Sequence, residues 1–152
     1  LYWFAAAWLG AASTDSLDAE VAVRLPALGT ILERALELDP DFNKGALHEL
    51  AMLYFSSMPP GLGHDEVRAG VHYEAALKAS GGLSASAHVA RAETWALKRQ
   101  DRKAFVMLLE KAMAIDPYKD RETTLVNVLA QNRARYLNQK LDELFWDEEV
   151  KE

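Results

Sequence analysis

Apolar residues recur along this chain with the spacing of helices rather than of strands. In residues 28–38 they fall at i, i+3, i+4 and i+7, which places them on one helical face. β-branched residues seldom occur together, and no clean period-2 run is present. The pattern predicts an all-α protein. The expected helices span residues 2–12, 18–38, 44–57, 66–79, 84–99, 101–115 and 121–145.

Proline and glycine mark where these helices should end. Asp39-Pro40 and Asp116-Pro117 are expected stops, because the residue before proline avoids helical backbone angles. The Gly-Gly pair at 81–82 should end the fourth helix. The stretch "MPPGLGHD", residues 58–65, is the one substantial loop expected. No boundary between domains is visible, so we expect a single helical repeat domain over residues 1–152.

One phrase of the sequence occurs twice. The stretch "ERALELDPDF", residues 33–42, matches "EKAMAIDPYK", residues 110–119, and a weaker copy, "YEAALKASGG", lies between them. The copies align Ala35, Ala76 and Ala112. Tetratricopeptide repeats span about 34 residues and carry Ala before a closing Pro. The echo therefore predicts a tetratricopeptide-like stack of helical hairpins closed by a long C-terminal helix. Chance similarity is the alternative, because amphipathic helices ending in Asp-Pro are common.

Composition narrows the partners and the chemistry. Half of the residues are apolar, and the formal net charge is −6. An acidic chain without a long basic run argues against a nucleic-acid partner. The absence of cysteine excludes disulfides, zinc thiolates and a cysteine nucleophile. The apolar start, "LYWFAAAWLGAAS", falls short of the roughly 18 residues that a membrane-spanning helix needs.

Candidate catalytic motifs are incomplete. The stretch "HELAM", 48–52, lacks the second His of a zinc-protease helix, and "PPGLG" lacks the Lys and Ser/Thr of a phosphate-binding loop. His64 and His72 would bind a metal only if the fold brought further ligands to them. No Ser/His/Asp set assembles from the sequence. We therefore expect a protein that is not an enzyme and has neither cofactor nor metal. The basic stretch "KRQDRK", 98–103, is either a solvated face or a patch for an anionic partner.

Aromatic and histidine residues repeat at helical spacing on faces that could line a groove. Helices with two apolar faces are either sandwiched between neighbours or line a cavity. Core packing is the alternative for each of these residues, and His72 is also expected as a half-buried residue bonded to a neighbour. The candidate ligand- or partner-binding residues are Phe4, Trp8, His48, Met52, Phe55, His72, His88, Arg91 and Trp95.

Several stretches together resemble a known family. These are "LYWFAAAWLGAA", "ALELDPDFNKGALHEL", "HYEAALKASGG", "RAETWALKRQDRKAFVMLLEKAMAIDP" and "LVNVLAQNRARYLNQKLDELF". In the same order, they are similar to the T-component (TatT-like) lipoproteins of TRAP transporters. Phe4 departs from the family, which often has Gly there, and Tyr136 departs where Trp is frequent. We interpret both departures as repacking.

The resemblance has consequences for location and partners. It implies a periplasmic protein, similar to tetratricopeptide-repeat proteins, whose N-terminal helices and lipidated cysteine precede Leu1. It also implies a partnership with the solute-binding protein of a TRAP transporter. The expected function is a non-enzymatic accessory role that binds this protein, a hydrophobic or amphipathic organic acid, or both. The alternative is a generic adaptor that binds a peptide in its groove. Such a groove would carry a ladder of Asn and Lys/Arg, whereas aromatic and His residues occur here. The oligomeric state is left open, with a homo-oligomer among the options.

Overall fold

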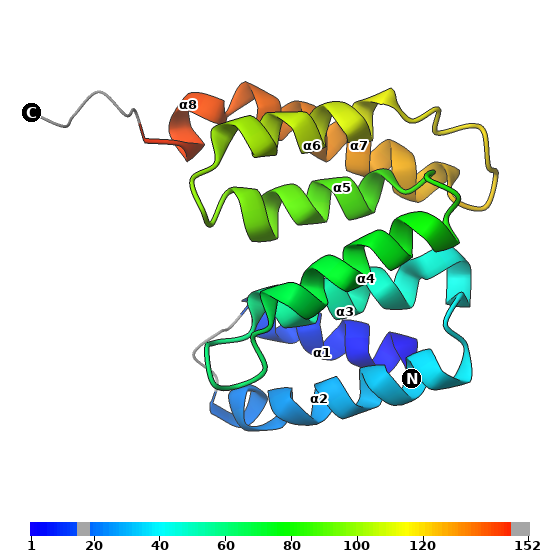
Figure 1. Ribbon diagram of the computed structural model, residues 1–152, viewed down its shortest axis with the longest axis vertical. Coiled ribbons are helices and arrows are strands. Elements are labelled where there is room, and N and C mark those ends of the chain that lie inside the picture. The colour runs from blue at the N-terminus through cyan, green and yellow to red at the C-terminus, as the bar shows by residue number, and fades with distance from the viewer. Residues whose placement is uncertain (15–18, 147–152) are drawn as a thin grey trace, which may run out of the picture. The chain divides into compact units, whose positions relative to one another are not determined.

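The protein is built from helices, as Figure 1 shows. The structure, a computed structural model, describes residues 1–14 and 19–146, and no strand occurs among them. The all-α prediction is confirmed. The chain forms two compact units, Leu1–Ser80 and Gly81–Glu152, here called the N-terminal and C-terminal units. The single repeat domain over 1–152 stays a prediction, and the expected helix start at residue 18 lies outside the described residues.

The N-terminal unit packs three helices around a central fourth helix, α3. Helix α3 contacts α1, α2 and α4 (Figure 1). Helix α2 ends directly before Asp39-Pro40, and the loop 58–65 separates α3 from α4, both as expected. The elements are α1 (Tyr2–Thr14), α2 (Ala19–Leu38), the short turn η1 (Phe42–Gly45), α3 (Ala46–Ser57) and α4 (Glu66–Ala79).

A close backbone approach fixes the entry to α3. The chain takes positive φ angles at Asn43, Lys44 and Gly45, so α3 begins two residues later than expected. At Gly45, with φ of 93°, an added Cβ would lie 3.0 Å from backbone atoms of Ala76. Because Gly45 and Ala76 both lack a bulky side chain, η1 can lie directly against α4.

The C-terminal unit contains two departures from the expected helices. The predicted helix 84–99 begins as α5 but continues through a π-helical turn, in which the Leu97 amide donates to the Ala92 carbonyl at 2.9 Å. The predicted helix 121–145 is wrong as one long element, because it breaks at Lys140, whose amide bonds to the Leu137 carbonyl. The elements are α5 (Ala85–Arg91), η2 (Ala92–Ala96), α6 (Arg102–Ala114), α7 (Thr124–Gln139) and α8 (Leu141–Leu144).

Buried amides tie α7 to its neighbours. Asn127 accepts a hydrogen bond from the Ala85 amide at 3.0 Å and donates one to the Leu83 carbonyl at 2.9 Å. Gln131, one turn further on, donates to the carbonyls at the end of α6. Because both side chains are buried, these hydrogen bonds fix how α7 packs against α5 and α6.

The three echoed alanines all lie in the interior. Ala35 is 5% exposed, and Ala76 and Ala112 are fully buried. The sequence repeat predicts close-packed contacts at Ala35 and Ala112, and the burial of both residues agrees with this prediction. The superposition of residues 18–57 on 101–145, and with it the tetratricopeptide-like stack, stays a prediction.

Candidate functional site

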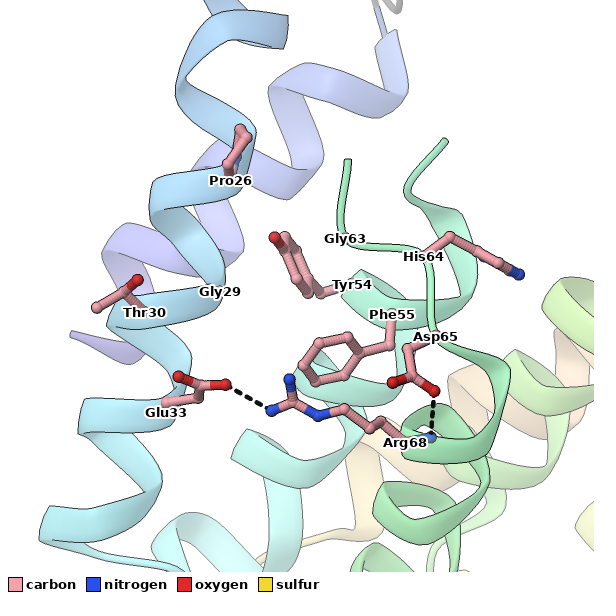
Figure 2. Close-up of a pocket in the computed structure, with 10 residues that line it drawn as sticks. All are labelled: Pro26, Gly29, Thr30, Glu33, Tyr54, Phe55, Gly63, His64, Asp65 and Arg68. Atoms are coloured by element: carbon pink, nitrogen blue, oxygen red, sulfur yellow. Dashed lines mark hydrogen bonds and ion pairs between the residues drawn. The ribbon is translucent and has the colours of Figure 1, made fainter. Parts of the chain in front are cut away.

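A polar cleft opens in the N-terminal unit between α2, the end of α3 and the start of α4 (Figure 2). Its volume is about 300 Å³. This lies at the lower end of the range for ligand pockets, roughly 300–1,000 Å³, so the cleft has room for a small metabolite. Its lining residues are Pro26, Gly29, Thr30, Glu33, Tyr54, Phe55, Gly63, His64, Asp65 and Arg68.

Arg68 is held in place at the cleft wall. Its Nη2 donates to Glu33 Oε1 at 2.6 Å, which joins the first turn of α4 to α2. The guanidinium carbon also lies 3.9 Å from the centre of the Phe55 ring. The side chains of Arg68 and Glu33 are 44% and 49% exposed, so the ion pair itself adds little stability. Its effect is to orient a cation whose remaining N–H groups can bind a ligand.

Tyr54 forms the closed side of the cleft, and two glycines make room for it. An added Cβ would lie 2.9 Å from the Tyr54 hydroxyl at Gly29 and 2.8 Å from it at Gly63. Tyr54 is 2% exposed, and burial raises the pKa of its phenol. The ring therefore lies between α2 and the loop 58–65, where larger residues would close the space.

Asp65 closes the loop onto the helix that follows. Its carboxylate accepts the Arg68 amide at 2.9 Å as the N-cap of α4, and its own amide donates to the Phe55 carbonyl at 3.0 Å. These two bonds place a carboxylate and the Arg68 guanidinium at one end of the cleft. The charged groups of the cleft are then Glu33, Asp65 and Arg68, two negative and one positive.

A histidine pair lies behind Phe55. The Nδ1 atoms of His48 and His72 are 2.9 Å apart, and the Phe55 and His72 rings stack at 5.5 Å with a 6° interplanar angle. Burial, followed by the charges of His48 and Arg68, lowers the pKa of His72 to about 4. Burial also lowers the pKa of His48, against the opposing effect of Asp41. The half-buried His72 bonded to a neighbour is confirmed.

The other predicted residues of the N-terminal unit occupy different surroundings. Met52 is fully buried and Phe55 is 3% exposed, so both belong to the core, although Phe55 also lines the cleft. Phe4 is 52% exposed on α1, and Trp8 is half-buried with its ring 6.2 Å from that of Phe4. The structure thus brings His48, His72 and Phe55 together and places Phe4 with Trp8.

In the C-terminal unit, the predicted residue His88 is buried, whereas Arg91 and Trp95 are half-buried. His88 is 7% exposed, and burial, followed by the charge of Lys111, lowers its pKa to about 4. The Arg91 guanidinium lies 4.9 Å from the Trp95 ring centre, which is a cation–π contact. Arg99 lies 5.7 Å from the same ring. A single groove lined by residues of both units stays a prediction.

Four polar residues of the cleft did not emerge from the sequence as site candidates. Glu33 and Arg68 are 35 positions apart and meet only in the fold. Tyr54 lies in the expected helix 44–57, and Asp65 lies in the expected loop 58–65. The available signal was the stretch "GLGHDEVR", in which glycines precede a helix-capping Asp and an Arg in the first turn.

Neither a metal-binding group nor a membrane-spanning helix occurs in the described part of the chain. Among residues 1–14 and 19–146, no group of three or more His, Asp or Glu side chains is placed to hold a metal ion. The helices described there are all too short or too polar to cross a bilayer.

The described residues form an all-helical protein whose N-terminal unit carries a cleft large enough for a small molecule. A family model described as "TRAP transporter T-component" matches residues 1–145. The chain belongs to this family, so the suspected resemblance is confirmed. The description of this family names a component of TRAP transporters, which makes it a transport accessory family rather than an enzyme family.

A curated relative covers most of the chain. An uncharacterized protein of Treponema pallidum (strain Nichols) is 25% identical over 147 residues, which is 97% of this chain. The match spans 46% of the relative's own length. The chain therefore corresponds to about half of that protein.

Proposed function

We propose that this chain forms part of a periplasmic, non-enzymatic accessory protein that binds the solute-binding protein of a TRAP transporter. The observation that carries the proposal is the family match over residues 1–145. An anchor by an N-terminal lipid, upstream of Leu1, belongs to the same proposal. An accessory protein can influence transport by contacting the soluble carrier of the substrate.

Exposed aromatic side chains favour a protein partner. On α1, Trp3 is 78% exposed and Phe4 is 52% exposed. Aromatic residues are enriched at the centres of protein interfaces, where burying them releases water. Contact with a partner through α1 would remove both rings from solvent.

The test is titration calorimetry of the full-length protein with the solute-binding protein encoded beside it. We expect binding at least as tight as tens of micromolar, about −6 kcal/mol. Phe4→Ala should weaken it, whereas Trp146→Ala, which removes an 85% exposed ring elsewhere, should not. No heat and no co-elution at that concentration would favour the generic peptide-binding adaptor.

We also propose that the aromatic and histidine residues predicted from the sequence contribute to binding a hydrophobic or amphipathic organic acid. Trp95 is half-buried beside Arg91, which would pair an apolar ring with a cation for a carboxylate. A fluorescent fatty acid is the probe. Trp95→Ala should weaken its binding relative to Tyr118→Ala, a change at a 73% exposed ring. Equal binding by the wild type and both variants would reject this site.

A further inference from the structure

The cleft between α2, α3 and α4 combines the size, the aromatic residues and the charged groups of a site for a small molecule. It has about 300 Å³ of space, two aromatic walls and three charged groups of both signs at one end. We infer that this cleft binds a small zwitterion, a free amino acid with an apolar side chain. The cleft would do so whether or not the protein also binds a solute-binding protein or an organic acid.

The positive group has the properties of a carboxylate receptor. Arg68 Nη2 is engaged by Glu33, and the guanidinium carbon lies 3.9 Å from the Phe55 ring centre. A guanidinium has five N–H donors, so donors remain on Nη1 for a carboxylate. Because Glu33 and Phe55 already hold the Arg68 side chain, binding of a carboxylate would immobilise few additional rotatable bonds of Arg68.

The negative groups decide between ligand classes. A simple organic anion in the cleft would meet one guanidinium but two carboxylates, those of Glu33 and Asp65 (Figure 2). A simple amine would be attracted by the carboxylates and repelled by Arg68. A zwitterion satisfies both signs when its carboxylate faces Arg68 and its ammonium group faces Glu33 or Asp65. The arrangement of charges therefore favours the zwitterion over either singly charged analogue.

The rest of the cleft suits an apolar side chain. Tyr54 and Phe55 line it while being 2% and 3% exposed, so their rings are supported from behind by the core. At Gly29 and Gly63, a larger residue would push against the Tyr54 ring. Contact with the edges of these rings that face the cleft would remove part of an apolar side chain from water, which is favourable in proportion to the apolar area buried.

Three probes of related carbon skeleton test the charge argument on the wild-type chain. They are L-leucine, its decarboxylated analogue 3-methylbutylamine, and its deaminated analogue 4-methylpentanoate. Amide chemical shifts and calorimetry give the affinity of each probe. Each probe is added at up to about 10 mM, so that a dissociation constant of about 1 mM can be measured. We expect L-leucine to bind roughly tenfold more tightly than either analogue, with shifts at Gly29, Gly63 and Arg68.

Matched variants assign the two charges. Arg68→Gln should weaken L-leucine binding roughly tenfold, and Arg102→Gln should not, although Arg102 forms a similar ion pair with Asp142 at 2.7 Å. Glu33→Gln should also weaken it, whereas Glu37→Gln, at the Arg34 pair, is the control. Thermal melting of each variant verifies that it is folded.

Three results would overturn the inference. These are no chemical shift change with L-leucine, binding of one analogue as tight as that of L-leucine, and a loss of affinity in the control variants as large as that of Arg68→Gln. If Arg68→Gln fails to fold, the comparison of the three probes on the wild type still decides. Binding of the solute-binding protein is measured separately, so either interaction can fail without the other.

Discussion

Gln131 offers a direct test of how the C-terminal unit holds together. This residue of α7 is 4% exposed, and its Nε2 donates to the carbonyls of Ala112 at 3.1 Å and Ile115 at 2.6 Å. The last four carbonyls of a helix have no partner within the helix, and here α6 ends at Ala114. The Gln131 amide therefore satisfies carbonyls at the end of α6 from a neighbouring helix.

The perturbation is Gln131→Met, which keeps the length of the side chain and removes its donor. A neutral hydrogen bond contributes about 1 kcal/mol net, and a buried polar group left without a partner costs about 1–3 kcal/mol. With two bonds of good length lost and partial access of water to the freed carbonyls, we expect a loss of about 2–4 kcal/mol. Gln131→Glu should cost at least as much, because a carboxylate would then face carbonyl oxygens.

The assay is denaturant unfolding followed by circular dichroism, with hydrogen exchange of the α6 and α7 amides to localise the effect. Gln139→Met is the matched control, since Gln139 is an exposed residue at the end of the same helix. Its effect should stay within about 0.5 kcal/mol. The reasoning would be refuted if Gln131→Met destabilised the protein no more than Gln139→Met does.

Three further predictions concern other contacts. His72 has a pKa of about 4 in the folded chain and about 6.5 when unfolded, so the unfolded state binds more protons between pH 4 and pH 6.5. The free energy of unfolding should therefore fall as the pH drops from about 6.5 to 4. Thermal melts recorded across this range should show a smaller fall for His72→Phe. Gly10→Ala, where an added Cβ meets nothing within 4 Å, should stabilise α1 by about 0.5–1 kcal/mol. Gly29→Ala should show no such gain, because the added Cβ would collide with the Tyr54 hydroxyl. Equal gains in chemical denaturation would contradict this close contact at Gly29. Ala112→Leu should cost about 1–3 kcal/mol by overpacking a fully buried site, and an unfolding midpoint equal to that of Ala114→Leu, at an exposed position of the same helix, would contradict this.

Local signals in the sequence were enough to find most of the helices and the loop between α3 and α4. The helix stop at Asp39-Pro40 and the loop 58–65 depend on neighbouring residues alone, and the structure confirms both. The burial of Ala35, Ala76 and Ala112 also agrees with a pattern that is visible in the sequence. In contrast, the π turn before Leu97 and the break at Lys140 depend on how the helices pack, and no local signal predicted them.

The candidate site was predictable only in part. Helical spacing identified Phe55 and His72 but could not say which neighbours they would meet. The cleft depends on Arg68 reaching Glu33 across 35 positions and on Tyr54 fitting between two glycines of different elements. Contacts between residues so far apart follow from tertiary packing, which the spacing of residues along the sequence does not reveal.

The short contact between His48 and His72 has a consequence for the chemical identity of the two rings. A hydrogen bond between two Nδ1 atoms 2.9 Å apart needs one N–H donor and one lone pair. When both rings are neutral, one must therefore be the Nδ1–H tautomer and the other the Nε2–H tautomer. Two residues of the same type thus become distinguishable by nitrogen-15 chemical shift, and exchange of their roles would require both rings to move their protons together.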